Sequence, residues 1–340
     1  MYAHTLTRTL GVALLSLFMV SVWSCTGETG VLDKVLDAQE DGKWEESREL
    51  VDSILQAEMV QGEEIGLALM YRGYAGYVLG EYDEALVDYE QAESFRAEDP
   101  DLFYERGLVK HELRDQEGAI ADYDRTLELD PDYLEAYLDR GLAWQALEEY
   151  DKALADYTTL LSMDPEYLWA YLSRAWVYME QEQYHEALAD YNSAQELDPR
   201  HPYVYTDRSH TWGALGRYDK AWEDLTTALH IDSGDAYVLN EAAWFLSTCP
   251  DSNYRDGVWA VNLVEDLVLD YGWSDPWLVD TLAAAYAESS RFPEAVAMQE
   301  KAIELMGLDN WTDEELGKAR DRLELYENNR PYREEHQIVI

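Results

Sequence analysis

Small and aromatic side chains recur along the chain at a fixed interval of 34 residues. The small positions are Gly73, Gly107, Gly141, Ala175 and Ser209. An alanine follows each of them after twelve residues, at Ala85, Ala119, Ala153, Ala187 and Ala221. Large side chains come four residues later, at Tyr89, Tyr123, Tyr157, Tyr191 and Leu225. Such a repeat predicts an array of similar units, which must stack because none buries its apolar surface alone.

This period, with its small and large positions, resembles the tetratricopeptide repeat (TPR), a pair of antiparallel helices. The small residues would let the first helix approach the second, and the aromatic rings would fill the space beside them. Pro131, Pro165 and Pro199 close three of the units, as expected of residues that break helices. The resemblance implies an all-α, right-handed TPR solenoid of about eight helix-turn-helix units with a C-terminal capping helix.

The repeat pattern divides the chain into regular and irregular parts. Five regular units fit at 66–99, 100–133, 134–167, 168–201 and 202–235. The segment 25–65 fits a degenerate first repeat, and 236–309 fits two variant units. In the first variant unit Ala260 follows Ala243 by 17 residues instead of 12, which predicts a longer turn fixed by Arg255 and Asp256. We expect 310–340 to form a capping helix and a tail.

Two charged positions share the same period. An arginine precedes each small position of the regular units: Arg72, Arg106, Arg140, Arg174 and Arg208. An aspartate follows each of the alanines by three residues: Asp88, Asp122, Asp156, Asp190 and Asp224. In the variant units both charges are absent together, so we expect five Arg–Asp bridges, each joining the two helices of one unit. The alternative is a pair of solvated charge stripes.

Residues 1–24 are typical of an export signal, with an apolar run at 10–22 and no acidic residue. This run is shorter than the about 20 residues that a membrane-spanning helix needs. Val22-Trp23-Ser24-Cys25 resembles the bacterial lipobox, which implies a diacylglycerol on Cys25, and Thr26 then implies the outer membrane. The alternative is an ordinary secretory signal with an incidental cysteine. We expect an exported protein, lipid-anchored at the periplasmic face of the outer membrane rather than free in the periplasm.

The composition excludes several classes of partner. The formal net charge is −46, from 71 acidic and 25 basic residues. Nucleic acid is an unsuitable partner because phosphate binding needs clustered Lys and Arg, and charge would not hold the chain on an anionic membrane. We therefore expect membrane contact through the lipid anchor only. An apolar content of 47% with 13% aromatic residues indicates a folded chain rather than a disordered one.

No convergent set of catalytic or metal-binding residues is apparent. The histidines form no HExxH motif or comparable ligand pair, and two cysteines are too few for a disulfide framework or a cysteine-type zinc site. No glycine-rich phosphate loop occurs. Because the repeats occupy nearly the whole chain beyond the signal, we expect no enzyme activity, no cofactor and no metal.

The TPR resemblance also implies a ligand groove on the concave face, lined by the first helix of each unit. Carried over position by position, the groove residues are Tyr74, Tyr77, Tyr104, His111, Trp169, Trp176, Met179, Tyr203 and His210. The Lys and Asn residues with which some TPR domains grip a C-terminal carboxylate are absent here. The alternative is that these rings pack between adjacent helices or under the tail of the chain.

These observations predict a non-catalytic scaffold or adaptor in the bacterial cell envelope, which binds a protein or peptide partner in its groove. The alternative is a regulatory subunit of a separate envelope enzyme or assembly machine. The sequence does not identify the partner.

The excess of acidic residues predicts that salt stabilises the fold. Raising NaCl from a low level of about 0.01 M to a moderate level of about 0.1 M shortens the Debye length from roughly 30 Å to roughly 10 Å and screens self-repulsion. The melting temperature should therefore rise over this range in a circular dichroism experiment. A constant melting temperature would show that self-repulsion contributes little.

Overall fold

The computed structural model describes residues 30–308 and 311–334, and all regular structure within these ranges is helical. The prediction of an all-α fold is therefore confirmed. Cys25 and the export signal lie outside the described residues. The chain divides into two compact units, unit 1 up to Ser173 and unit 2 from Arg174, and the division falls within one helix, α10 (Leu168–Glu180).

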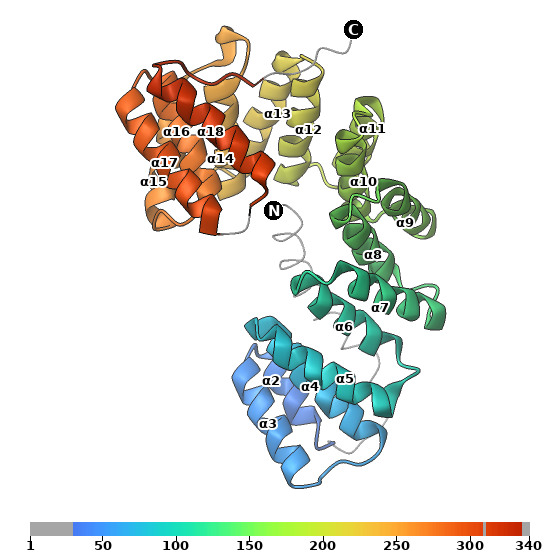
Figure 1. Ribbon diagram of the computed structural model, residues 1–340. Helices are drawn as coiled ribbons and strands as arrows, with labels where there is room; N and C mark the ends of the chain where they lie inside the picture. The colour runs from blue at the N-terminus through green and yellow to red at the C-terminus, as the bar shows by residue number, and fades with distance from the viewer. Residues whose placement is uncertain (1–29, 309–310, 335–340) are drawn as a thin grey trace. The chain divides into compact units, whose positions relative to one another are not determined.

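Unit 1 is a succession of antiparallel helix pairs (Figure 1). The pairs are α2 (Asp33–Glu40) with α3 (Trp44–Gln56), α4 (Glu63–Leu79) with α5 (Tyr82–Arg96), α6 (Pro100–Glu112) with α7 (Gln116–Leu129), and α8 (Leu134–Ala146) with α9 (Tyr150–Met163). The first helices of neighbouring pairs also contact each other, as α4 does with α6 and α6 with α8.

Unit 2 continues the same pattern after the second half of α10. Its helices are α11 (Tyr184–Leu197), α12 (Pro202–Ala214), α13 (Tyr218–Ile231), α14 (Ala236–Thr248), α15 (Gly257–Asp270), α16 (Pro276–Glu288), α17 (Phe292–Leu308) and α18 (Asp313–Glu327). The first helices α12 and α14 contact each other, as do α14 and α16, and α18 packs on α17 at the end of the stack.

Local sequence signals explain where these helices begin. Asp99, Asp235 and Asp275 each accept a hydrogen bond from a backbone N–H of the first helical turn, which satisfies donors that lack a partner within the helix. Thr312 and Glu315 form a reciprocal capping box at the start of α18. The polar segment that the sequence assigns to a capping helix therefore has its own start signal.

The longer turn of the first variant unit contains a short 3₁₀ helix, Ser252–Tyr254, between α14 and α15. Arg255 donates hydrogen bonds to the carbonyl oxygens of Cys249 and Pro250 and forms an ion pair with Glu288 at 3.0 Å. Asp256 caps α15 through the N–H of Trp259. These two residues thus hold the inserted turn against both neighbouring helices.

The small positions mark where the two helices of a pair approach closely. A Cβ atom on Gly141 would lie 2.4 Å from the ring of Tyr157, too close for any real side chain without a shift of the ring. Gly107 and Tyr123 show the same relation at 2.5 Å. The tyrosine rings are fully buried, so glycine and tyrosine fit each other across the helix pair.

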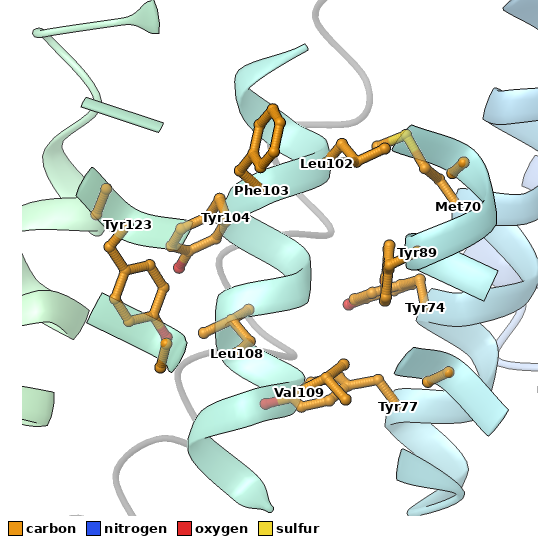
Figure 2. Close-up of a cluster of buried hydrophobic side chains, with 14 of the residues drawn as sticks. Met70, Tyr74, Tyr77, Tyr89, Leu102, Phe103, Tyr104, Leu108, Val109 and Tyr123 are labelled. Carbon is orange, nitrogen blue, oxygen red and sulfur yellow. The ribbon is translucent and has the colours of Figure 1, made fainter. Parts of the chain in front are cut away.

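The core of unit 1 is continuous from one pair to the next. Figure 2 shows Tyr74, Tyr77 and Tyr89 facing Leu102 and Val109 on α6. On the other side of α6, the ring of Tyr104 lies 6.0 Å from that of Tyr123. Each first helix therefore packs against its own partner and against the preceding pair, as stacking of repeats requires.

All five periodic arginines bind their aspartates with two hydrogen bonds each. The Arg Nε and Nη2 atoms donate to the two Asp carboxylate oxygens at 2.5–2.9 Å, and the Asp follows the Arg by sixteen positions in every case. The aspartates are buried, each 4–6% exposed. We call this series the Arg–Asp ladder; each of its pairs joins the two helices of one repeat.

Several arginines of the ladder also reach the preceding helix pair. The Nη1 atom of Arg72 lies 2.5 Å from Asp52, that of Arg106 lies 2.7 Å from Glu93, and that of Arg140 lies 2.5 Å from Asp124. In unit 2, Arg208 donates to Asn192 and Gln195. These guanidinium groups therefore connect three helices, with the fork geometry that suits arginine and not lysine.

The ladder predicts strong coupling between its partners. Replacing one partner of a buried ion pair typically costs about 3–5 kcal/mol, whereas replacing both with apolar residues costs far less. Arg140→Leu should therefore lower the free energy of unfolding strongly because Asp156 stays buried without its cation. The double variant Arg140→Leu/Asp156→Leu should recover most of the loss in urea unfolding experiments.

Lys152→Leu serves as the control because Lys152 and its partner Glu149 are about half exposed, and such surface pairs contribute about 0–1 kcal/mol. If the effects of Arg140→Leu and Asp156→Leu simply add in the double variant, the pair is not coupled and the ladder does not stabilise the fold.

Candidate ligand-binding face

The first helices of successive pairs form one continuous surface in each unit, which we call the inner face. In unit 1 it is built by α4, α6 and α8, and in unit 2 by α12, α14 and α16, since these helices contact each other in sequence. All the residues that the resemblance assigns to a ligand groove lie on first helices, including α10. Their exposure differs strongly from one residue to another.

In unit 1 the assigned groove residues are mostly covered. Tyr74, Tyr77, Tyr104 and His111 are 4–7% exposed, and Trp169 is half-buried. Tyr74 contacts Trp44 edge to face with ring centroids 5.7 Å apart, and Tyr104 lies 4.9 Å from the ring of Tyr133. These rings contribute packing between helix pairs, and little of their surface is open to a ligand.

In unit 2 the assigned residues are more accessible. Trp176, Met179 and Tyr203 are half-buried, and His210 is exposed. The Tyr203 hydroxyl donates to Asp235 at 2.8 Å, and the Thr211 hydroxyl lies 2.9 Å from the Met179 sulfur. Side chains of successive first helices therefore contact each other across the inner face.

His210 carries a positive charge in an acidic surrounding. Its Nε2 lies 2.7 Å from Glu241 on the next first helix. Burial among the neighbouring helices lowers the pKa of His210, but Glu241, with smaller contributions from Glu334 and Asp207, raises it to about 9. His210 is thus a charged and partly exposed side chain on the inner face of unit 2, paired with an acid of the next first helix.

The C-terminal tail covers another part of this face. Tyr332 lies 6.0 Å from the ring of Trp244, and the backbone N–H of Glu334 donates to the carbonyl oxygen of Thr248 at 3.0 Å. Arg333 forms an ion pair with Glu288 at 2.5 Å. The tail therefore binds α14 and the end of α16. It covers a surface that would otherwise be open to an external ligand.

Sequence reasoning missed a set of acidic residues on the inner face. Two residues before four of the small positions stand Glu105, Asp139, Asp207 and Glu241, spaced by multiples of 34. Asp139 accepts a hydrogen bond from Tyr104 at 2.7 Å, and Asp207 accepts one from Tyr237 at 3.1 Å, in both cases from a neighbouring first helix. The 34-residue period of these acids could have revealed them, but Tyr71 and Ser173 stand at two of the corresponding positions and interrupt the series.

Burial changes the protonation of these carboxylates. Desolvation raises the pKa of Asp139 to about 7, against the opposing hydrogen bond from Tyr104. It also raises the pKa of Glu105 well above its usual range. Asp101 and Glu135, one helical turn before them, have raised pKa values for the same reason, although Asp101 is exposed. The inner face of unit 1 is thus an acidic surface.

The described residues also show how the candidate metal ligands and the remaining cysteine are placed. Within 30–308 and 311–334, no group of three or more His, Cys, Asp or Glu side chains could hold a metal ion. Cys249 is 1% exposed, and burial raises the pKa of its thiol to about 11, so the thiolate that would react is disfavoured. No helix of the described ranges is both long and apolar enough to cross a bilayer.

Comparisons with known sequences agree with the repeat pattern. Family models described as TPR repeat or tetratricopeptide repeat match residues 73–114, 104–167 and 168–201. No curated protein sequence matches the chain.

Solved structures with the same fold extend the comparison to most of the chain. A tetratricopeptide repeat protein from Parabacteroides merdae is 18% identical, with a TM-score of 0.58, and the match covers 88% of this chain and 98% of that one. Yeast Tom70 is 17% identical, with a TM-score of 0.63, over 94% of this chain and 69% of its own. The family models therefore identify residues 73–201 as tetratricopeptide repeats, and the solved structures show that most of the chain has the fold of such repeats.

Proposed function

We propose that this protein is a non-catalytic scaffold, which binds a segment of a partner protein on the inner face of its first helices. TPR proteins generally mediate protein–protein interactions. The observation that carries the proposal is the inner face itself, where half-buried aromatic side chains at Trp176 and Tyr203 accompany an exposed, charged His210. Partly exposed aromatic rings are typical binding hot spots.

The proposal places the protein in the bacterial cell envelope, anchored through Cys25. A lipid chain contributes about 0.8 kcal/mol for each methylene group buried in a bilayer, so several acyl chains hold a soluble domain firmly. The repeats would then be held near the membrane without a spanning helix of their own, and partners would be other envelope proteins.

Removal of two indole rings from the inner face should abolish partner binding. We expect that a Trp169→Ala/Trp176→Ala variant, tagged at its C-terminus and isolated from native envelopes in mild detergent, loses a partner that the wild type retains. Phe95→Ala/Trp259→Ala is the matched control because these two rings lie on second helices and are 38% and 37% exposed. Circular dichroism establishes that both variants fold.

The identity of the retained partner separates two forms of the proposal. A non-enzymatic envelope protein supports the scaffold, whereas co-purification of a defined catalytic protein supports a regulatory subunit. Unchanged binding by the folded Trp169→Ala/Trp176→Ala variant contradicts a role for the inner face.

Lipid attachment is tested separately from partner binding. Wild-type protein should incorporate labelled palmitate and sediment with membranes, whereas Cys25→Ser should incorporate none and appear in the soluble fraction. Cys249→Ser, which changes a buried thiol in unit 2, should behave as the wild type. Equal labelling or equal sedimentation of wild type and Cys25→Ser would exclude the anchor.

A further inference from the structure

Four carboxylates lie together on the inner face of unit 1. Asp101 and Glu105 are one turn apart on α6, and Glu135 and Asp139 are one turn apart on α8, so each pair shares one face of its helix. The helices contact each other, and Asp101 acts electrostatically on both Glu105 and Glu135. We call these four residues the acidic cluster.

The acidic cluster lacks the cations that other buried acids of unit 1 possess. Asp88, Asp122 and Asp156 are buried to a similar extent as Glu105 and Asp139, and an arginine binds each of them. Within residues 30–173, no lysine or arginine forms an ion pair with any of the four cluster carboxylates. Arg96, a nearby cation, is held by Asp99 at 2.5 Å.

Glu105 is the least satisfied member of the cluster. Its side chain is 6% exposed, and its buried Oε2 atom makes no hydrogen bond of good geometry. The buried hydroxyl of Tyr89 is its hydrogen-bonding neighbour, but a hydroxyl supplies no positive charge. An unpaired buried polar atom typically costs about 1–3 kcal/mol, and more when the group is charged, so its presence needs a reason.

We propose that the acidic cluster binds a cationic segment, bearing Lys or Arg side chains, of the partner protein. A bound ammonium or guanidinium group would supply the missing counter-charge and donate hydrogen bonds to Glu105, as charge-assisted pairs do elsewhere in the fold. This inference rests on the proposed function, and it adds the chemistry of the partner. The absence of a three-ligand metal group among the described residues argues against a metal ion as the occupant.

The surroundings of the cluster favour a peptide cation. Tyr133 donates to Asp101 at 3.0 Å and Tyr104 donates to Asp139 at 2.7 Å, which fixes two of the carboxylates. The net charge of −46 draws cationic ligands toward the protein, while the cluster supplies a defined place for them.

Binding should become stronger as the pH rises from 6 to 8. Asp139, with a pKa raised to about 7, is neutral below this pH and charged above it, so only the higher pH provides its negative charge. Packed around the cluster are titratable or charged groups: Arg96, Asp99, Asp130, Tyr71, Tyr74, Tyr77, Tyr89, Tyr104, Tyr123, Tyr133, Tyr157 and Tyr167. Burial raises the pKa of each of these tyrosines above its usual value near 10, so they stay neutral in this range.

The test uses full-length protein in mild detergent and a fluorescein-labelled peptide of alternating Gly and Lys, with a Gly–Glu peptide as the ligand control. We expect the dissociation constant of the lysine peptide at pH 8 to rise about tenfold in Glu105→Gln/Glu135→Gln, a change equivalent to about 1.4 kcal/mol. Glu84→Gln/Glu90→Gln, on the exposed side of α5, is the matched control because it changes the net charge by the same amount. It should change the dissociation constant less than about twofold.

A second variant keeps the test decisive if the first one unfolds. Asp101→Asn/Glu135→Gln changes two less buried members of the cluster and should weaken binding in the same direction. Equal weakening of peptide binding in the cluster and control variants would show that only the overall negative charge of the protein attracts the peptide. That result would overturn the inference. Binding that is unaffected by either cluster variant would overturn it as well.

Failure of this inference is distinguishable from failure of the proposed function. In one possible outcome the Trp169→Ala/Trp176→Ala variant loses its envelope partner, but the cluster variants bind the lysine peptide as tightly as the wild type does. The scaffold function would then be supported, and the partner would not place a cationic segment at the acidic cluster.

Discussion

The Arg–Asp ladder is the interaction that the five regular repeats share and on which their packing depends. A TPR pair buries small and aromatic residues between its helices and against the preceding pair, and the ladder adds polar bonds at the same seams. Arg72, Arg106 and Arg140 bind an aspartate of their own pair and an acid of the pair before it. A single guanidinium fork therefore ties three helices together and helps to set the spacing of the inner face.

This ladder also accounts for the contrast between two kinds of buried acid. Aspartates at the seam between the helices of a pair are neutralised within the fold, whereas the acidic cluster on α6 and α8 is not. Protein interiors rarely leave a carboxylate without a partner, because desolvation opposes its charge. On a binding surface the unfavourable free energy of an unpaired carboxylate can favour binding, since a cationic ligand would remove it.

The sequence was sufficient for everything that repeats strictly. The helix pairs follow from the small and large positions, and the pairing of Arg140 with Asp156 follows from two charges that share one period. The second partners of the arginines lie 20, 13 and 16 residues before Arg72, Arg106 and Arg140, so no fixed spacing indicates them. Whether Tyr74 or Trp176 packs or stays accessible depends on side-chain packing between pairs, which a residue pattern does not determine.

The most direct test of this account is site-specific photocrosslinking in native envelopes. A benzoylphenylalanine placed at Asp101 or His210, both exposed on first helices, should crosslink a discrete partner. The same group at Val87 or Val258, which are 50% and 66% exposed on second helices, should give no such product. Crosslinks from the second-helix positions alone, or equally from all four, would contradict the claim that the inner face is the working surface.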